Sequence, residues 1–317
     1  METHLRLTRE PRVVFGMPAY KRADMLAETL ESLLSQTYPD FAIVITDDAP
    51  SPEVSAIVES YAARDTRITY EPNAVRLGMI GNWRQAFARS RERYPGSEYF
   101  AWVSDHDMWH PRWLESLVGV LDAQRSVVMA YPLMYRVYPS DARRRIARIV
   151  ETVGITRPQD RLRLAIRRMT AGNAIYGLFR ASALAQAGVF RPVVAPDRQV
   201  LLELSLLGEF RHVPEFLWYR EVSGAFSYQR QRRMFFPTHV PWHTYLPANL
   251  QHFAVVLWDF AVRGRGRPRF GRLAGARYAT LQLWYSTVRD ITRGDAPWRA
   301  WLRSARPAGA ESARATE

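Results

Sequence analysis

Two acidic residues separated by one position form the most informative motif of this sequence, Asp105-His106-Asp107. They follow the apolar run YFAWV at 99–103, which predicts a short buried strand. Open α/β sheets bind their ligands at the carboxyl edge of the strands, where such a turn would lie. A divalent cation such as Mg²⁺ or Mn²⁺ that carries a diphosphate suits two neighbouring carboxylates. The alternative is a solvated turn, because aspartate is common in turns.

A second acidic pair, Asp47-Asp48, ends another apolar run at 41–46. Acids at the ends of two neighbouring strands can address a single ligand. The pair can accept a hydrogen bond from a nucleotide base or a ribose hydroxyl, while the Asp-His-Asp turn holds a metal and phosphates. Helix capping or turn formation is the alternative for one of these two acids.

The segments that must position these acids alternate between strands and helices. Apolar runs predict strands at 12–17, 41–46, 67–70 and 99–103. Apolar residues at helical spacing predict helices after a cap at Asp24, around 54–61 and over 78–94. This alternation predicts a parallel, doubly wound sheet.

Further elements follow this alternating part. The expected ones are strands at 127–131 and 174–180, a polar connection around 143–145, a short helix capped by Ser182 and an apolar helix over 200–207. After about residue 241 the sequence changes to two aromatic-rich helices. Residues 304–317 are rich in Ala, Ser, Arg and Pro, which is typical of a disordered tail.

Composition places the chain among globular proteins, with 317 residues of which 47% are hydrophobic. The sequence has no cysteine, which excludes disulfides, thiol nucleophiles and Cys–zinc sites. Its first residues contain no apolar segment typical of a signal peptide, and no window is apolar and long enough to cross a bilayer. We therefore expect a cytoplasmic protein, with the inner face of the cell membrane as a place of attachment.

The net charge of +13 indicates an anionic partner. Arginine supplies nearly all of the basic residues, since Lys21 is the only lysine. The basic residues are scattered and no nucleic-acid-binding motif is present, so we expect no nucleic acid partner. The helix around 253–260, followed by the arginine cluster at 263–269, resembles an interfacial amphipathic element and predicts peripheral membrane contact. Simple packing of this helix on the rest of the protein is the alternative, and it is the interpretation that we slightly favour.

Several motifs in order carry a family resemblance. They are VFGMPAY at 14–20, TLESLLSQTY at 29–38, VITDDA at 44–49, LG with GNW at 77–83, and SDHD at 104–107. Over about residues 10–225 the chain resembles the family 2 glycosyltransferases of the GT-A fold. The resemblance implies an α/β fold, with a Rossmann-like nucleotide-binding half, a mixed central sheet and, in this chain, a C-terminal helical extension.

The resemblance also implies an inverting transfer from a nucleotide-diphosphate sugar to an acceptor hydroxyl. The acceptor is expected to be a glycan or a lipid-linked sugar in surface polysaccharide or glycolipid synthesis. Asp48 corresponds to the acid that recognises the base, and Pro18, Ala19 and Tyr20 line the nucleotide pocket.

The remaining donor-site residues implied by the resemblance come from the Asp-His-Asp turn and its surroundings. Asp105 and Asp107 correspond to the acids that contact ribose, a divalent cation (Mg²⁺ or Mn²⁺) and diphosphate, with Asp107 as the direct metal ligand. His106 departs from the commonest family pattern and is either a neutral spectator, the interpretation we favour, or a partner of the diphosphate. Trp109 and Arg220 are candidates for acceptor and diphosphate contacts.

The catalytic base implied by the resemblance is an acid that precedes a late helix, and Asp197 fits this place. A carboxylate there would accept the proton of the acceptor hydroxyl. Family members often carry a Glu-Asp pair where this chain has Pro196 before the aspartate. Glu203 is the alternative base, although it lies within the apolar helix.

The resemblance suggests a division into a glycosyltransferase domain over 1–240, a helical extension over 241–303 and the tail. The domain itself would have a nucleotide-binding half at about 10–125 and an acceptor half at about 126–240. Two other functions remain open. A sugar nucleotidyltransferase would carry a glycine-rich basic signature after the first strand, which PAYKR at 18–22 is not. A non-catalytic protein that binds a membrane surface is the second.

Overall fold

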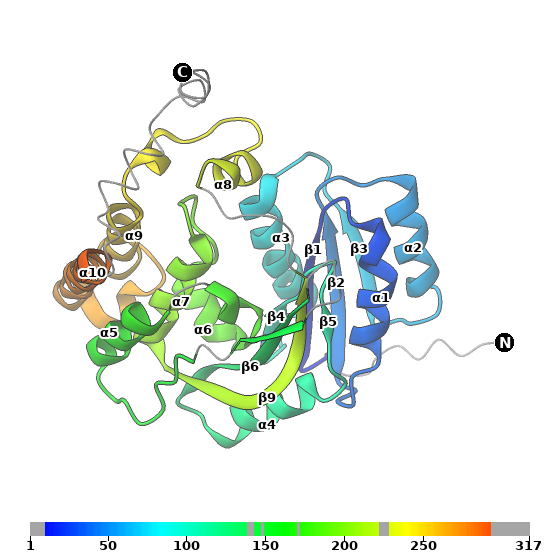
Figure 1. Cartoon of the computed structure of the whole chain (residues 1–317), viewed down its shortest axis with the longest axis horizontal. Coiled ribbons are helices and arrows are strands. Elements are labelled where there is room, and N and C mark those ends of the chain that lie inside the picture. Colours follow the sequence, from blue (N-terminus) through cyan, green and yellow to red (C-terminus); the bar gives the residue numbers. More distant parts are fainter. Residues whose placement is uncertain (1–9, 138–142, 147–148, 170–171, 222–227, 293–317) are drawn as a thin grey trace, which may run out of the picture.

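The computed structural model describes residues 10–137, 143–146, 149–169, 172–221 and 228–292. Its centre is one mixed sheet of nine strands, with helices on both faces (Figure 1). The strand order is β3-β2-β1-β4-β8-β6-β9-β5, and β7 pairs with β6 outside this path. The mixed sheet confirms the α/β class and the GT-A architecture expected from the resemblance.

The first four strands of this order are parallel and are connected by helices. They are β3 (Ile68–Pro72), β2 (Phe41–Asp47), β1 (Val13–Ala19) and β4 (Tyr99–Trp102). The connecting helices are α1 (Ala23–Leu34), α2 (Pro52–Ala62) and α3 (Gly78–Arg93). This part of the predicted alternation is therefore confirmed, including the ends of the two strands that carry the acidic pairs.

Beyond β4 the strand directions change, so the predicted fully parallel sheet is wrong there. β8 (Leu178–Arg180) is antiparallel to both β4 and β6 (Val127–Val137). β9 (Glu209–Glu221) is parallel to β6 and antiparallel to β5 (Met108–Trp109), a short strand that directly follows the Asp-His-Asp turn. The carboxyl end of β9 therefore reaches the same edge of the sheet as those of β1, β2 and β4.

Two connections differ from the prediction. The arginines at 143–145 belong to β7 (Arg143–Ile146), which pairs with the end of β6 instead of forming an irregular connection. The first part of the predicted strand at 174–180 belongs to a 3₁₀ helix, η1 (Gly172–Tyr176), and only the last part forms a strand, the short β8. An apolar run alone does not distinguish these two structures, because both bury their side chains.

Strand β1 continues through Pro18, where the sequence predicted its end. The carbonyl oxygen of Gly16 faces β4 and accepts from the Val103 amide, whereas that of Ala19 faces β2 and accepts from the Asp48 amide. Pro18 therefore faces the side of β4, and that strand ends at Trp102. A proline at this position costs no hydrogen bond of the ladder.

Two predicted helix caps are also wrong. Arg22 occupies the cap position of α1, and the Asp24 carboxylate instead accepts two hydrogen bonds from the Arg22 guanidinium, at 2.9 and 3.1 Å. Helix α6 (Ala181–Ala187) begins one residue before the predicted cap, Ser182. Local pairing of an arginine with an aspartate competes with capping, since both use the same carboxylate.

The core consists of two hydrophobic clusters on the two faces of the sheet. One joins Phe15 and Ile43 to α1, α2 and α4 (Trp113–Ala123). The other joins Val14 and Val44 to α3, α5 (Pro158–Arg168) and α7 (Pro196–Leu207). Neighbouring residues of one strand enter different clusters because side chains alternate across a sheet. Both clusters draw on both predicted halves of the domain, so the division at 125 stays a prediction.

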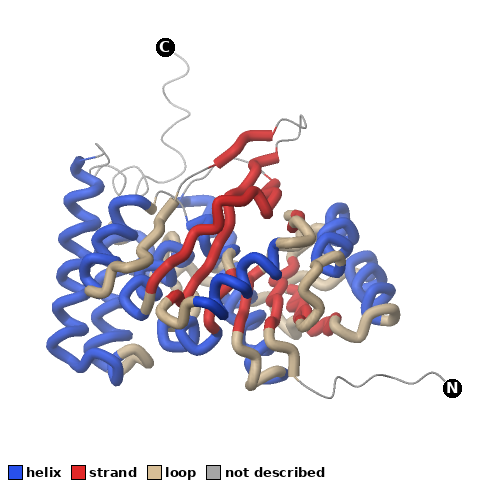
Figure 2. The backbone as a smooth tube through the Cα atoms, turned by 90° about the horizontal axis from the view of Figure 1, so that it is seen from below, coloured by secondary structure: helices blue, strands red, loops and turns tan. Residues whose placement is uncertain are grey.

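The C-terminal helices pack on different parts of the molecule, the last of them on α5 and the first on α3 (Figures 1 and 2). They are α8 (Tyr228–Phe235), η2 (Trp242–Tyr245), α9 (Ala248–Leu257), η3 (Trp258–Val262) and α10 (Arg267–Thr292). Val256, Phe260 and Tyr278 belong to the same cluster as the apolar side chains of α7. The extension is therefore continuous with the core.

The contact between η3 and α10 depends on one glycine. A Cβ at Gly275 would lie 1.9 Å from the carbonyl oxygen of Phe260, so only glycine permits this approach. Within the described ranges, none of the helices is both long and apolar enough to span a bilayer. The predicted tail at 304–317 lies outside the described residues.

Candidate functional site

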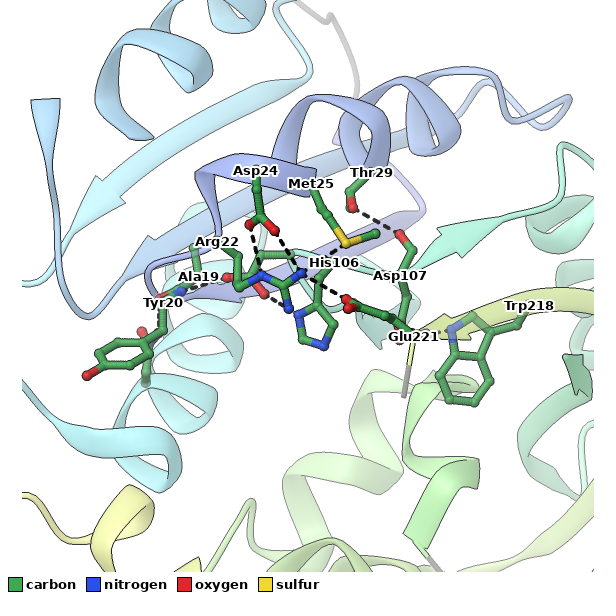
Figure 3. Close-up of polar contacts among 12 residues, drawn as sticks. Ala19, Tyr20, Arg22, Asp24, Met25, Thr29, His106, Asp107, Trp218 and Glu221 are labelled. Carbon is green, nitrogen blue, oxygen red and sulfur yellow. Dashed lines mark hydrogen bonds and ion pairs between the residues drawn. The ribbon is translucent and has the colours of Figure 1, made fainter. Parts of the chain in front are cut away.

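The candidate site lies at the carboxyl edge of the sheet, where the loops after β1 and β4 meet the end of β9. Figure 3 shows Tyr20 and Arg22 from the first loop, His106 and Asp107 from the second, and Glu221 from β9. These segments are far apart in sequence. Their convergence follows from the parallel directions of β1, β4 and β9.

Asp105 fastens the turn after β4 to the loop after β1. Its Oδ2 accepts the Tyr20 backbone N–H at 2.7 Å, and its Oδ1 lies 2.7 Å from Nδ1 of His106. Burial tends to lower the pKa of His106, but the hydrogen bond to Asp105 and the charges of Asp107 and Asp105 outweigh it and raise that pKa. The surroundings thus shift His106 toward the imidazolium form, and its role, as spectator or as partner of the diphosphate, stays a prediction.

Asp107 fastens the same turn to β9 and α1. Its Oδ1 accepts the Glu221 backbone N–H at 2.9 Å, and its Oδ2 accepts the Trp218 indole N–H at 3.1 Å. The Thr29 hydroxyl donates to the Asp107 carbonyl oxygen at 3.0 Å. Burial raises the pKa of Asp107, against the opposing charges of His106 and Arg220. The residue is only 2% exposed and has a structural role besides any role in binding.

A further ion pair connects the loop after β1 to the end of β9. Arg22 Nη2 lies 2.9 Å from Glu221 Oε2, so Arg22 bridges Asp24 and Glu221 (Figure 3). Both side chains of the Arg22–Glu221 pair are about a quarter exposed. This pair and Asp107 together hold the last residue of β9 in place.

The second acidic pair is engaged by neighbouring backbone and side chains. Asp48 Oδ1 accepts the Leu77 N–H at 2.6 Å, and Oδ2 accepts the Gly78 N–H at 2.8 Å. Asp48 therefore caps α3, which is the alternative that the sequence left open. Asp47 is fully buried, which raises its pKa, and its Oδ2 accepts the Tyr70 hydroxyl at 2.9 Å. The base contact of Asp48 stays a prediction.

Of the three predicted pocket residues at the end of β1, only Tyr20 offers a side chain to solvent. Pro18 and Ala19 are buried, whereas Tyr20 is 37% exposed. The Lys21 ammonium and the Arg76 guanidinium lie 5.5 and 5.1 Å from its ring centroid. An exposed ring between two cations is suited to stacking on a nucleotide base whose phosphates are negative.

Asp197 lies in the first turn of α7, close to the same edge. Burial raises the pKa of Asp197, while the Arg198 backbone N–H and the charges of Arg198 and Arg220 act in the opposite direction. Ala195, which precedes the helix, has a positive φ of 50°, a conformation that costs free energy for any residue but glycine. Strained residues of this kind cluster at functional sites.

Arg220 on β9 connects the two acidic centres. Its charge lowers the pKa of both Asp107 and Asp197, so the guanidinium acts electrostatically on both acids. The guanidinium contacts Asn173 Oδ1 and lies 5.8 Å from the rings of both Tyr176 and Trp218. A cavity of about 50 Å³ adjoins these groups, and its lining includes Met129, Tyr131, Met169, Asn173, Tyr176 and Trp218.

Two sequence-predicted residues have positions that do not suit their predicted roles. Trp109 is 2% exposed and packs in the core beside Trp218, which leaves little ring surface for an acceptor sugar. Glu203 is fully buried below the C-terminal helices, and its Oε1 accepts from Gln199 at 2.9 Å. Burial and the charge of Asp259 raise its pKa well above the usual range. Glu203 is thus a core residue and not an alternative base at the sheet edge.

The carboxylates of the Asp-His-Asp turn form an incomplete metal site. No group of three His, Cys, Asp or Glu side chains in the described residues is placed to hold a metal ion. Each oxygen of Asp105 and Asp107 contacts one protein nitrogen and keeps a further lone pair. These oxygens fit a cation that takes its other ligands from phosphate and water, as Mg²⁺ commonly does.

Sequence reasoning missed Arg22, Glu221 and the role of Trp218. Arg22 follows the recognised motif directly, and its charge beside the nucleotide loop was a usable signal. Trp218 and Glu221 lie in a strand more than a hundred positions from Asp107, so no local pattern connects them.

The profile of the family described as "Glycosyl transferase family 2" matches residues 15–182, more than half of the chain. The chain therefore belongs to this family. It is 27% identical over 115 residues to an uncharacterized glycosyltransferase of Rickettsia typhi, which covers 36% of this chain and 33% of that protein. WcaA of Escherichia coli, named for colanic acid biosynthesis, is 24% identical over 41% of this chain and 43% of its own. The match thus spans less than half the length of these relatives.

Solved structures show the same fold over nearly the whole chain. Staphylococcus aureus TarS 1-349 in complex with UDP-GlcNAc superposes with a TM-score of 0.60 and 14% identity, covering 92% of this chain and 79% of TarS. The mannosyltransferase PcManGT of Pyrobaculum calidifontis, in complex with GDP-Man and Mn²⁺, gives 0.53 and 17% identity, covering 94% and 80%. At this identity the likeness confirms the fold.

Proposed function

We propose that the protein transfers a sugar from a nucleotide-diphosphate donor to an acceptor hydroxyl, with inversion at the anomeric carbon. The observation that carries this proposal is the attachment of the Asp-His-Asp turn to the end of β9 through Asp107, because β9 carries Arg220, whose charge acts on both Asp107 and Asp197. It puts a cation suited to a diphosphate next to both a phosphate-and-metal site and a candidate base. Similar structures hold UDP-GlcNAc and GDP-Man, which supports a nucleotide sugar as the donor.

Donor binding is assigned to the loops at the sheet edge. The Tyr20 ring would stack on the base, and Asp48 beside it would accept a base N–H through a remaining lone pair. The diphosphate would lie between His106 and Arg220, whose cationic forms offset its charge.

Asp107, together with Asp105, would hold Mg²⁺ or Mn²⁺ beside the diphosphate. The bound cation would stabilise the negative charge that develops on the leaving nucleoside diphosphate. The presence of Mn²⁺ with PcManGT supports this assignment.

Asp197 would take the proton of the acceptor hydroxyl. The burial that raises its pKa makes its carboxylate a stronger base than an exposed aspartate. Attack from the face opposite the leaving group then inverts the anomeric configuration. No second carboxylate is needed at the reacting carbon, in contrast to glycoside hydrolysis.

The acceptor is assigned to a glycan or lipid-linked sugar of surface polysaccharide or glycolipid synthesis, presented at an anionic membrane. The name of WcaA supports the polysaccharide setting. Exposed apolar side chains on two adjacent helices support the membrane. They are Leu250 and Trp258 on α9 and η3, and Leu273, Trp284, Val288 and Ile291 on α10. Exposed arginines accompany them at positions 263, 265, 272 and 277, which complements an anionic surface.

Vesicle co-sedimentation tests the membrane assignment. Wild type should bind vesicles containing anionic phosphatidylglycerol and dissociate at high salt, because the electrostatic part of the attraction is screened. Replacing both Trp258 and Trp284 by Ser should abolish binding while leaving circular dichroism unchanged. Equal binding by wild type and the double variant would contradict the proposed membrane surface. It would favour the alternative that these helices only pack on the rest of the protein.

The release of nucleoside diphosphate tests the transferase proposal as a whole. A panel of UDP-, GDP- and dTDP-sugars is incubated with Mg²⁺ or Mn²⁺ and with lipid extract as acceptor. Transfer produces nucleoside diphosphate and a glycosylated acceptor. The sugar nucleotidyltransferase alternative would instead release pyrophosphate from a nucleoside triphosphate and a sugar phosphate. Membrane binding without either product would favour the non-catalytic alternative.

A further inference from the structure

We infer that the C-terminal helices position Asp197, with Gln251 and His252 as the positioning residues. This inference rests on the proposed role of Asp197 as the base. The segment at 192–195 precedes α7 and determines where its first turn lies. Among the described residues, no strand of the sheet pairs with this segment. Its backbone is contacted by side chains of the C-terminal helices instead.

Four backbone atoms of this segment contact side chains from the C-terminal helices. Gln251 Oε1 accepts the Val194 N–H at 3.0 Å, and His252 Nε2 lies 2.9 Å from the Val194 carbonyl oxygen. His243 Nε2 lies 2.7 Å from the carbonyl oxygen of Pro192. Gln231 Oε1 accepts the Ala195 N–H at 3.4 Å. The C-terminal helices thus supply the hydrogen bonds that a neighbouring strand would otherwise give to this segment.

The two residues on α9 are themselves fixed. Gln251 is buried, and its Nε2 donates to the carbonyl oxygens of Thr244 and Leu246, at 3.2 and 2.7 Å. Burial lowers the pKa of His252 to about 3, so its ring is neutral at any working pH and its Nε2–H donates to Val194. Both contacts therefore persist across the pH range in which an aspartate base would operate.

The backbone conformation explains why such support is needed. Ala195 has a φ of 50° and Phe190 a φ of 37°, so non-glycine residues adopt left-handed conformations at the end of the segment and shortly before it. Such conformations persist only when the surroundings hold them. Ala195 also accepts the first helical hydrogen bond of α7, from the Gln199 N–H at 3.2 Å. Relaxation at Ala195 would therefore move Asp197, two residues later.

A matched pair of variants tests this inference. Gln251→Ala removes the contact with Val194. Asn249→Ala removes a buried amide from the same helix, but that amide donates to Thr287 on α10, at 2.9 Å. His252→Phe is a second variant that keeps a ring and loses the donor. Thermal unfolding of all three shows how much stability each change costs.

Hydrogen exchange is then measured over residues 190–199. Steady-state turnover is measured separately, with the best UDP- or GDP-sugar of the panel as donor. Gln251→Ala and His252→Phe should speed amide exchange at Val194 and Ala195 about tenfold or more. They should lower kcat about 10- to 100-fold, the scale of a small misplacement of a reacting group. The KM for the donor and the Kd for the free nucleotide should stay within about twofold of wild type. Asn249→Ala should change neither exchange nor kcat.

Two results overturn the inference. One is unchanged exchange over 190–199 in Gln251→Ala and His252→Phe. The other is a loss of kcat in Asn249→Ala as large as that in Gln251→Ala when the two variants lose the same stability. The C-terminal helices would then only stabilise the fold. Failure of the proposed function has a different signature. Asp197→Asn would then turn over like wild type, while the exchange result would still report on the segment.

Discussion

The two sides of the candidate site are built by different means. On the nucleotide side, Asp48 is held by Leu77 and Gly78, about 30 positions away and within the same run of alternating strands and helices. On the other side, Asp107 is held by Trp218 and Glu221, more than 110 positions away. The first side is a compact module, whereas the second exists only when distant parts of the chain have assembled. Catalysis and stability should therefore be separable on the first side and coupled on the second.

The largest effect is expected at Asp197. Asp197→Asn keeps the size of the side chain but removes its ability to accept a proton, so kcat should fall by about 10²–10⁴. The Kd of UDP or GDP should remain unchanged, since the proposed task exists only on the way to the transition state. Steady-state kinetics and calorimetry check both. Turnover within a few-fold of wild type would show that Asp197 is not the catalytic base.

Asp197 should also determine the pH dependence of turnover. Because burial raises its pKa, the group is ionised only at a higher pH than an ordinary aspartate. The acidic limb of the kcat profile should therefore lie above the usual aspartate range, with activity lost as pH falls through it. A profile that is flat down to pH 4 would contradict the assignment.

Asp107→Ala tests the coupling of binding to stability. The variant should lose the effect of Mg²⁺ or Mn²⁺ on nucleotide affinity. It should also lose about 1–3 kcal/mol of unfolding free energy, because the buried Trp218 indole N–H is left without an acceptor. Calorimetry with and without metal, together with urea unfolding, separates the two effects. Unaltered metal dependence would move the cation elsewhere, and unaltered stability would contradict the structural role.

Tyr20→Ala tests the nucleotide side, where function should be lost without stability. Loss of stacking should weaken nucleotide binding by about 1–3 kcal/mol, the range for base–aromatic stacking. The unfolding free energy should hardly change, because the ring is partly exposed and its backbone N–H still binds Asp105. Tyr20→Phe is the control and should bind like wild type. Equal affinity of Tyr20→Ala and wild type would place the base away from this ring.

The smallest effect is expected at Glu203, far from the chemistry. Its folded pKa is raised well above 4.5, so its contribution to stability is full below the unfolded value and lost as pH rises through the folded one. Glu203→Gln should therefore match wild type near pH 5 and become more stable than wild type by pH 8. Denaturant unfolding at both values measures this. A gap that stays constant with pH would show that Arg191 already compensates for the charge.

The contrast between the two sides also explains what the sequence could predict. Strands β1 to β4 and the two acidic pairs were predicted because apolar runs and the residues that end them are local signals. The direction of β8, the strand β7 and the contacts of β9 were not, because they depend on pairing between distant segments. Within the site, the binding roles of Tyr20 and Arg220 stay predictions. Trp109 and Glu203 are buried away from the accessible surface, which no local pattern reveals.

Lys21 has a practical consequence for studying this protein. It is the only lysine of the sequence, it adopts a left-handed backbone conformation, and its ammonium lies 5.5 Å from the Tyr20 ring. Amine-reactive dyes, crosslinkers and surface-immobilisation chemistry would otherwise scatter over many side chains, but here the only lysine target is beside the proposed nucleotide pocket. A fluorophore placed there would report donor binding directly. For the same reason, amine coupling to a sensor surface would block the site that it was meant to measure.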